Sequence, residues 1–104
     1  MIWLVWLRVE PLPGCKVVPE SFDPSLECAL PAPSAADVPA ALDLALARHR
    51  QRVAEIEACV LFEARDWNDA NDPERRVREA ARAAREAGAP RFVSFGLMPP
   101  APRA

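Results

Sequence analysis

The sequence predicts a single α/β domain: a two-layer sandwich of about four mixed strands, with two helices on one face, in the order β-β-α-β-α-β. Three observations support this prediction. Apolar residues alternate as in strands at the start of the chain and over 55–65. Two segments, 37–53 and 72–88, repeat apolar residues at helical spacing. A length of 104 residues, 51% of them hydrophobic, suits one domain over residues 1–98 with a Pro-rich tail over 99–104.

The first two strands are expected at Ile2–Glu10 and Ser25–Leu30. Apolar side chains of the first point to both faces, Trp3, Val5, Leu7 and Val9 to one and Ile2, Leu4 and Trp6 to the other. A strand of this kind has cover on both sides. Prolines divide the chain between the two strands, so the second is expected to be a short edge strand.

The third strand is expected over Glu55–Arg65, where the alternation is cleanest. Its core face would hold every second residue, namely Ile56, Ala58, Val60, Phe62 and Ala64. Cys59 and Leu61 would then face away from the core. The last strand is expected over Arg91–Met98, and three prolines follow it.

The first helix is expected to begin near Ser34 or Asp37; with Asp37 as N-cap, Pro39 falls in the first turn, where its missing N–H costs nothing. Its buried stripe would hold residues at helical spacing, namely Val38, Ala41, Leu42, Ala45, Leu46, His49 and Val53. His49, the single histidine, is therefore interpreted as a packed side chain near the end of this helix.

The second helix carries stronger end signals. Asp72 can cap it, Pro73 fits its first position and Gly88 fits its C-terminal stop. Its inner stripe is small, formed by Val77, Ala80, Ala81 and Ala84. This helix should therefore lie close to the sheet.

Two helices on one face would leave the other face of the sheet open. Trp3 or Trp6 would then point to the open face, near Leu61. Either the segment 11–24 folds across this patch, or the patch is a surface for a partner or for self-association.

The sequence carries no motif for catalysis, for a metal or for a cofactor. No serine lies in a G-x-S-x-G elbow, no glycine-rich phosphate loop occurs, and His49 has no second ligand at helical spacing. Three widely spaced cysteines, Cys15, Cys28 and Cys59, suit reduced thiols in a cytoplasmic protein. No apolar run is long enough to span a membrane, and no secretory signal is recognisable.

Charge also limits the choice of partners. The formal net charge of −2 argues against binding of nucleic acid through overall charge. The second helix carries an arginine ladder, Arg75, Arg78, Arg82 and Arg85, that could hold phosphates. Glutamates interleave with these arginines, so a solvated face with ion pairs is the preferred interpretation.

The most distinctive segment is Asp66–Asp72, with three carboxylates and a tryptophan in seven residues between a strand and a helix. It does not match a calcium loop, because Ala70 and Val77 stand at ligand positions. Two interpretations remain open. Trp67 either folds back onto the core within a capping loop, or anchors a protein–protein contact with an acidic rim.

A small acidic α/β chain with such a loop and no catalytic motif resembles bacterial immunity proteins, the antidotes that block toxins such as those of contact-dependent growth inhibition systems. The resemblance covers size, charge and lack of motifs over the whole chain, with local support at Asp66–Asp72. It implies a non-enzymatic inhibitor that binds a cognate toxin, for example a nuclease. Nuclease clefts are basic, so carboxylates placed there compete with substrate phosphates. The expected partner-binding residues are Asp66, Trp67, Asn68, Asp69 and Asp72, with the aspartates as phosphate mimics.

Two other functions remain open at this point. A homo-oligomeric structural or regulatory subunit would use the open sheet face. A small RNA-binding domain or enzyme would use the arginines of the second helix.

Overall fold

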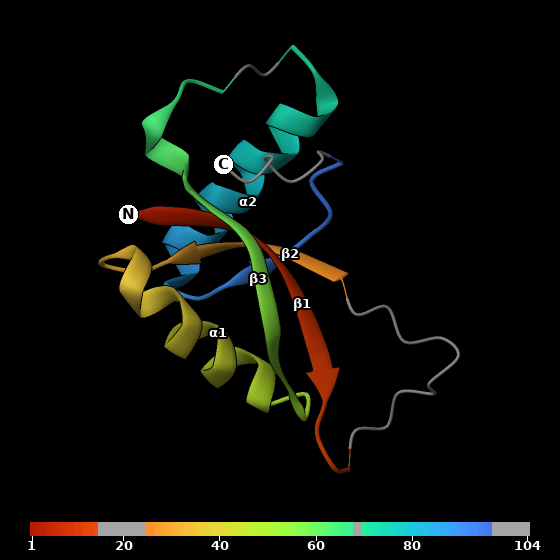
Figure 1. Ribbon diagram of the computed structural model, residues 1–104. Helices are drawn as coiled ribbons and strands as arrows, with labels where there is room; N and C mark the ends of the chain where they lie inside the picture. Colours follow the sequence, from red (N-terminus) through yellow and green to blue (C-terminus); the bar gives the residue numbers. More distant parts are fainter. Residues whose placement is uncertain (15–24, 68–69, 97–104) are drawn as a thin grey trace, which may run out of the picture.

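The computed structural model describes residues 1–14, 25–67 and 70–96 (Figure 1). The elements follow the predicted order β-β-α-β-α-β: β1 (Ile2–Pro11), β2 (Ser25–Pro31), α1 (Val38–Ala47), β3 (Gln51–Leu61), α2 (Asp72–Ala87) and β4 (Arg91–Phe92). Two single-turn 3₁₀ helices precede α1 and follow β3, η2 (Ala35–Asp37) and η3 (Phe62–Ala64). The predicted α/β class, with four strands and two helices, is confirmed.

The four strands form one sheet in the order β3-β1-β2-β4, and every neighbouring pair is antiparallel. The expectation of a mixed sheet is therefore wrong. The expectation of β2 as an edge strand is also wrong, because β2 pairs with β1 on one side and with β4 on the other. β2 and β3 do run in the same direction, but β1 lies between them, so they form no parallel pair.

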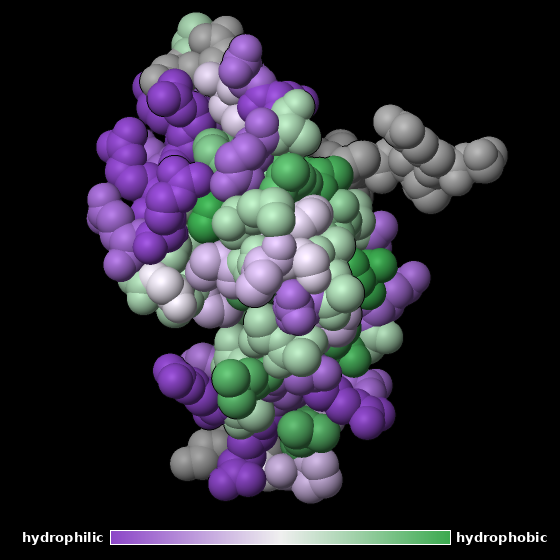
Figure 2. Space-filling model, turned by 90° about the vertical axis from the view of Figure 1, so that its left-hand side faces the viewer, coloured by the Kyte–Doolittle hydropathy of each residue, from purple (hydrophilic) through white to green (hydrophobic). Residues whose placement is uncertain are grey.

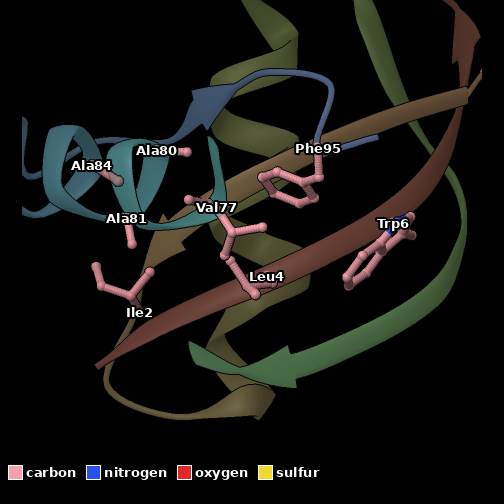
Figure 3. Packing of buried hydrophobic residues seen from close by; sticks show 9 residues of the cluster. Ile2, Leu4, Trp6, Val77, Ala80, Ala81, Ala84 and Phe95 are labelled. Atoms are coloured by element: carbon pink, nitrogen blue, oxygen red, sulfur yellow. The ribbon is translucent and has the colours of Figure 1, made fainter. Parts of the chain in front are cut away.

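The two helices cover opposite faces of the sheet, which corrects the predicted two-layer arrangement. Ile2, Leu4 and Trp6 of β1 pack with the small stripe of α2, as Figure 3 shows. The alternate β1 residues pack with α1 on the other face, in a cluster with Val5, Leu7, Val9, Val38, Leu42 and Leu46. The physical reason is the apolar character of both faces of β1, since each face has to be buried.

The predicted open apolar face is therefore absent from the described part of the chain. Trp6 is 5% exposed and meets Phe95 edge to face, with ring centroids 5.5 Å apart (Figure 3). Trp3 is half-buried on the α1 face and donates its Nε1–H to the Ala32 carbonyl at 3.1 Å. Self-association through an open sheet face accordingly loses its structural basis.

The register of β3 departs from simple alternation at two bulges. Trp6 pairs with Ala58 and Leu7 with Ile56, so Glu57 is an extra residue with no partner in β1. Ile56 therefore packs on the α1 face, whereas Ala58 packs on the α2 face. The predicted common core face is wrong at this point, and so is the outward position of Cys59, which packs on the α1 side.

The helix ends also differ in detail from the prediction. Asp37 stands at the N-cap of α1 but makes no side-chain cap, because its carboxylate accepts the Ser34 hydroxyl at 2.8 Å. α1 ends at Ala47, so His49 lies exposed in the following turn instead of packing in the core. The four residues predicted for the inner stripe of α2 are all buried, which confirms that prediction.

The last strand is much shorter than expected, because β4 contains only Arg91 and Phe92. The chain then leaves the sheet, and Phe95 is fully buried on the α2 face. Its backbone N–H donates to the Glu27 carboxylate at 2.6 Å. Leu97 and Met98, with the tail over 99–104, lie outside the described residues. Among the described helices, none has the length and apolar character needed to cross a bilayer.

Candidate functional site

The predicted acidic segment Asp66–Asp72 follows η3 and leads into the start of α2, and η3 and the start of α2 both lie at one end of the molecule (Figure 1). Its far end is fixed by the N-cap of α2. The N-cap residue is Asn71, whose side-chain oxygen accepts the Glu74 backbone N–H at 2.9 Å. The prediction of Asp72 as the N-cap is therefore wrong by one residue. The Asn71 amide also contacts the Glu74 carboxylate, so the two residues form a reciprocal cap.

Trp67 fixes the near end of the loop by folding back onto the protein. Its Nε1–H donates to the Phe62 carbonyl at 2.8 Å, and its ring stacks on Phe62 with centroids 5.8 Å apart and planes 7° apart. The Arg65 guanidinium lies 3.7 Å from the centroid of the indole ring. Trp67 is half-buried against the core on the α2 face. The indole ring therefore anchors the start of the loop to the core on the α2 face.

Ion pairs join this loop to α2. Arg65, already in contact with Trp67, binds the Glu74 carboxylate at 2.6 Å. Asp72 pairs with Arg75 one helical turn later. Glu63 accepts the backbone N–H of Ile2 at 2.9 Å and also binds Arg85 at 3.1 Å. Most charges around the loop thus stabilise its conformation.

The predicted site residues differ in their exposure and in their ion pairs. Asp66 is exposed, and no ion pair joins it to another described residue. Trp67 is half-buried, and Asp72 is exposed but paired with Arg75. Asn68 and Asp69 lie outside the described residues. Asp66 is therefore the described carboxylate of this loop that is exposed and not engaged in an ion pair with another described residue.

Sequence reasoning missed the residues that hold the loop in place, Phe62, Arg65 and Glu74. The pair Asn71 and Glu74 was visible as a capping box, since a capping side chain followed three residues later by Glu is its usual form. No local sequence pattern predicts that Arg65 lies over the Trp67 ring and also binds the Glu74 carboxylate. That arrangement depends on how η3 turns the chain after β3.

Elsewhere in the described part of the chain, the polar residues were compared with the requirements of a metal site and of a binding pocket. Within the described ranges, no three His, Cys, Asp or Glu side chains lie close enough together to hold a metal ion. An open hollow of about 540 Å³ lies beside the start of β3, where Arg52 pairs with Glu10 and Asp43 accepts the Val53 N–H at 3.1 Å. The other lining residues are Gln51 and the apolar side chains of Leu12, Ala47, Val53 and Ala54.

The two described cysteines flank Val5 on neighbouring strands of the α1 face. Burial raises the pKa of Cys28 to about 12, with a further contribution from the nearby Cys59. Burial also raises the pKa of Cys59. Both thiols are therefore protonated and weakly nucleophilic at neutral pH, which suits packing residues.

The arginines of α2 are partly neutralised by neighbouring acids. Arg75 and Arg85 bind carboxylates, and Glu79 and Glu86 lie exposed on the same helix. Figure 2 shows hydrophilic residues gathered over the upper left of the molecule, at the height where Figure 1 places α2. This surface mixes both signs of charge.

Comparison of the chain with known protein families, with curated proteins and with solved structures finds no match.

Proposed function

We propose that the chain is a non-enzymatic protein-binding inhibitor, an immunity protein that blocks a cognate bacterial toxin in the cytoplasm through the loop Arg65–Asp72. The observation that supports this proposal is the way the loop is built. Trp67 holds one end through a hydrogen bond and two ring contacts, and Asn71 holds the other through the helix cap. Asp66, directly before Trp67, is left exposed.

A loop fixed before binding has an energetic advantage in recognition. Ordering a flexible segment on binding costs free energy, so a preorganised loop retains more of its contact energy as affinity. Arg65 is central to this arrangement, because it contacts Trp67 and Glu74 together. Asp66, which lies between Arg65 and Trp67 in the chain, is thereby suited to present its carboxylate in one geometry.

The chemistry of the loop favours a basic partner surface. A nuclease cleft is lined with cations that bind phosphates, and a carboxylate such as Asp66 can occupy a phosphate position. Asn68, Asp69 and Asp72 are the other partner-binding residues of this proposal, and Asp72 would have to exchange its ion pair with Arg75 for one with the partner. In this proposal Trp67 contributes the exposed part of its indole to the contact and keeps the loop in shape.

The test begins with affinity purification from the source organism, with wild-type protein, Asp66→Asn and Glu86→Gln as parallel baits. Glu86 is a matched control, because it is an exposed carboxylate at the opposite end of α2. The retained protein is then produced alone, and its affinity and its activity on DNA or RNA are measured with and without the chain.

We expect one equivalent of wild-type chain to abolish the toxic activity of this partner. Asp66→Asn should weaken binding by about tenfold, as for a charged hydrogen bond or close ion pair of roughly 1.4 kcal/mol. Glu86→Gln should bind as wild type does. A partner whose activity is unchanged at saturation, or equal affinities for all three baits, would contradict the proposal.

A further inference from the structure

The outer edge of β3 offers backbone groups that no strand in the described part of the chain pairs with. β3 is the first strand in the order β3-β1-β2-β4, so only one of its edges is occupied, by β1. Every residue of β3 is at least partly exposed. The edge leads directly into η3 and the loop Arg65–Asp72 (Figure 1).

The register identifies which residues turn their backbone outward. The Ala32 N–H donates to the Met1 carbonyl, which places the backbone groups of odd-numbered β1 residues on the β2 side. Even-numbered β1 residues therefore face β3, and the Ile2 N–H accordingly reaches the Glu63 carboxylate. Leu4 pairs with Val60 and Trp6 with Ala58. Cys59, between these pairs, points its N–H and C=O groups away from the sheet. Leu61, beyond them, points its N–H outward, whereas its carbonyl belongs to the first turn of η3, of which Leu61 is the N-cap.

The two halves of this edge differ in protection. The first half carries both bulges and the exposed charges Arg52, Glu55 and Glu57, features that hinder pairing with another strand. The second half, Ala58–Leu61, has a regular register and only apolar side chains. An added strand could therefore pair along Ala58–Leu61.

We propose that the Ala58–Leu61 edge binds an extended basic segment of the partner by strand addition, with hydrogen bonds to Cys59 and Leu61. This inference rests on the proposed function and specifies how the partner is held. The edge is continuous with the loop that carries Asp66, so one extended partner segment can contact both.

The charges around the edge favour a basic partner strand over a second copy of the chain. Glu55 and Glu57 are exposed, and neither forms an ion pair with another described residue. Asp66 adds a further carboxylate beyond η3. An antiparallel second copy would bring the same acidic set to the seam, and like charges across a strand pair are destabilising. Lysines or arginines on the incoming strand would pair with these carboxylates.

Leu61 allows a sharp test, because its φ of −76° already matches the ring geometry of proline. Leu61→Pro removes the outward N–H without removing a hydrogen bond to β1, whereas Leu61→Ala removes the side chain and keeps the N–H. The probe is a seven-residue capped peptide of alternating lysine and valine, and a glutamate–valine peptide is its control. Binding is followed by NMR shifts of the backbone amides, and folding of each variant is checked in the same spectra.

We expect the lysine peptide to shift the Cys59 and Leu61 amides of the wild-type chain and to protect them from hydrogen exchange. Leu61→Pro should bind about fivefold more weakly than Leu61→Ala, the effect of one hydrogen bond. Equal binding by the two variants, binding of the glutamate peptide with the same strength, or a dimer formed through this edge would overturn the inference. Asp66→Asn tests the loop separately, so a toxin that depends on Asp66 but tolerates Leu61→Pro would refute only the edge proposal.

Discussion

Replacement of Trp67 tests whether the loop Arg65–Asp72 is built as the structure shows. Trp67→Phe retains an aromatic ring that can stack on Phe62 but removes the Nε1–H that donates to the Phe62 carbonyl at 2.8 Å. A hydrogen bond of this kind contributes about 1 kcal/mol to the free energy of unfolding. The contact with Arg65 is also weaker for a phenyl ring, so the total loss should be about 1.5 kcal/mol.

Trp67→Ala removes the whole ring and should cost more. The indole is partly buried, and burial of roughly 100 Å² of apolar surface stabilises by about 2.5 kcal/mol. With the hydrogen bond included, the expected loss is about 3 to 4 kcal/mol, as an upper estimate. Such a loss is a large share of the stability of a domain of this size.

The assay is equilibrium unfolding in urea followed by far-ultraviolet circular dichroism, which does not depend on the mutated fluorophore. The matched control is Trp3→Phe, because Trp3 also donates its Nε1–H to a carbonyl, that of Ala32 on the α1 face. We expect a loss of about 1 kcal/mol for Trp3→Phe, somewhat less than for Trp67→Phe, since it removes one hydrogen bond but not the contact with Arg65. A loss below about 0.5 kcal/mol for both Trp67 variants would show that the indole is free of the core and refute the loop geometry.

Three further predictions concern stability and use the same urea assay. Asn71→Ala should lower the free energy of unfolding by about 1 kcal/mol and Asp72→Ala by clearly less, because Asn71 caps α2. A larger loss for Asp72→Ala would show that Asp72 is the N-cap residue. Phe95→Ala should cost about 3 to 5 kcal/mol because the ring is fully buried, and a loss below about 1 kcal/mol would remove this segment from the core. The pKa of the Cys28 thiol is about 12 in the folded state against 9.0 ordinarily, so stability should fall as pH rises from about 9 to 12. The unfolded chain loses that proton first, and Cys28→Ala should reduce this pH dependence measurably.

Local pattern predicted most elements of the fold but not the side on which each helix lies. The buried stripes of both helices can be read from spacing, because a helix places residues three and four apart on one face. The prediction of a common face assumed that each strand–helix–strand unit joins neighbouring parallel strands. In the structure β1 separates β2 from β3, and α2 joins antiparallel strands at opposite edges of the sheet. The apolar character of both faces of β1 already required cover on each side.

The bulge at Glu57 shows a second limit of sequence patterns. Strict alternation over 55–65 predicts one common face, but a single extra residue exchanges the faces of all residues on one side of it. Neither composition nor spacing marks that residue, because its position follows from pairing with β1. The true faces, Ile56 towards α1 and Ala58 towards α2, required the tertiary structure.

The candidate site was predicted in position but not in internal structure. Two interpretations of Trp67 were open, and the structure favours the fold-back onto Phe62. The surrounding loop still presents Asp66, so fold-back and partner binding are compatible: an anchored indole holds the carboxylate in place. The same turn at η3 that brings Trp67 onto Phe62 also ends the pairing of β3 beside the unprotected Ala58–Leu61 edge. Because η3 adjoins both the loop Arg65–Asp72 and the Ala58–Leu61 edge, we expect a variant that releases Trp67 from Phe62 to weaken the binding of a partner at either place.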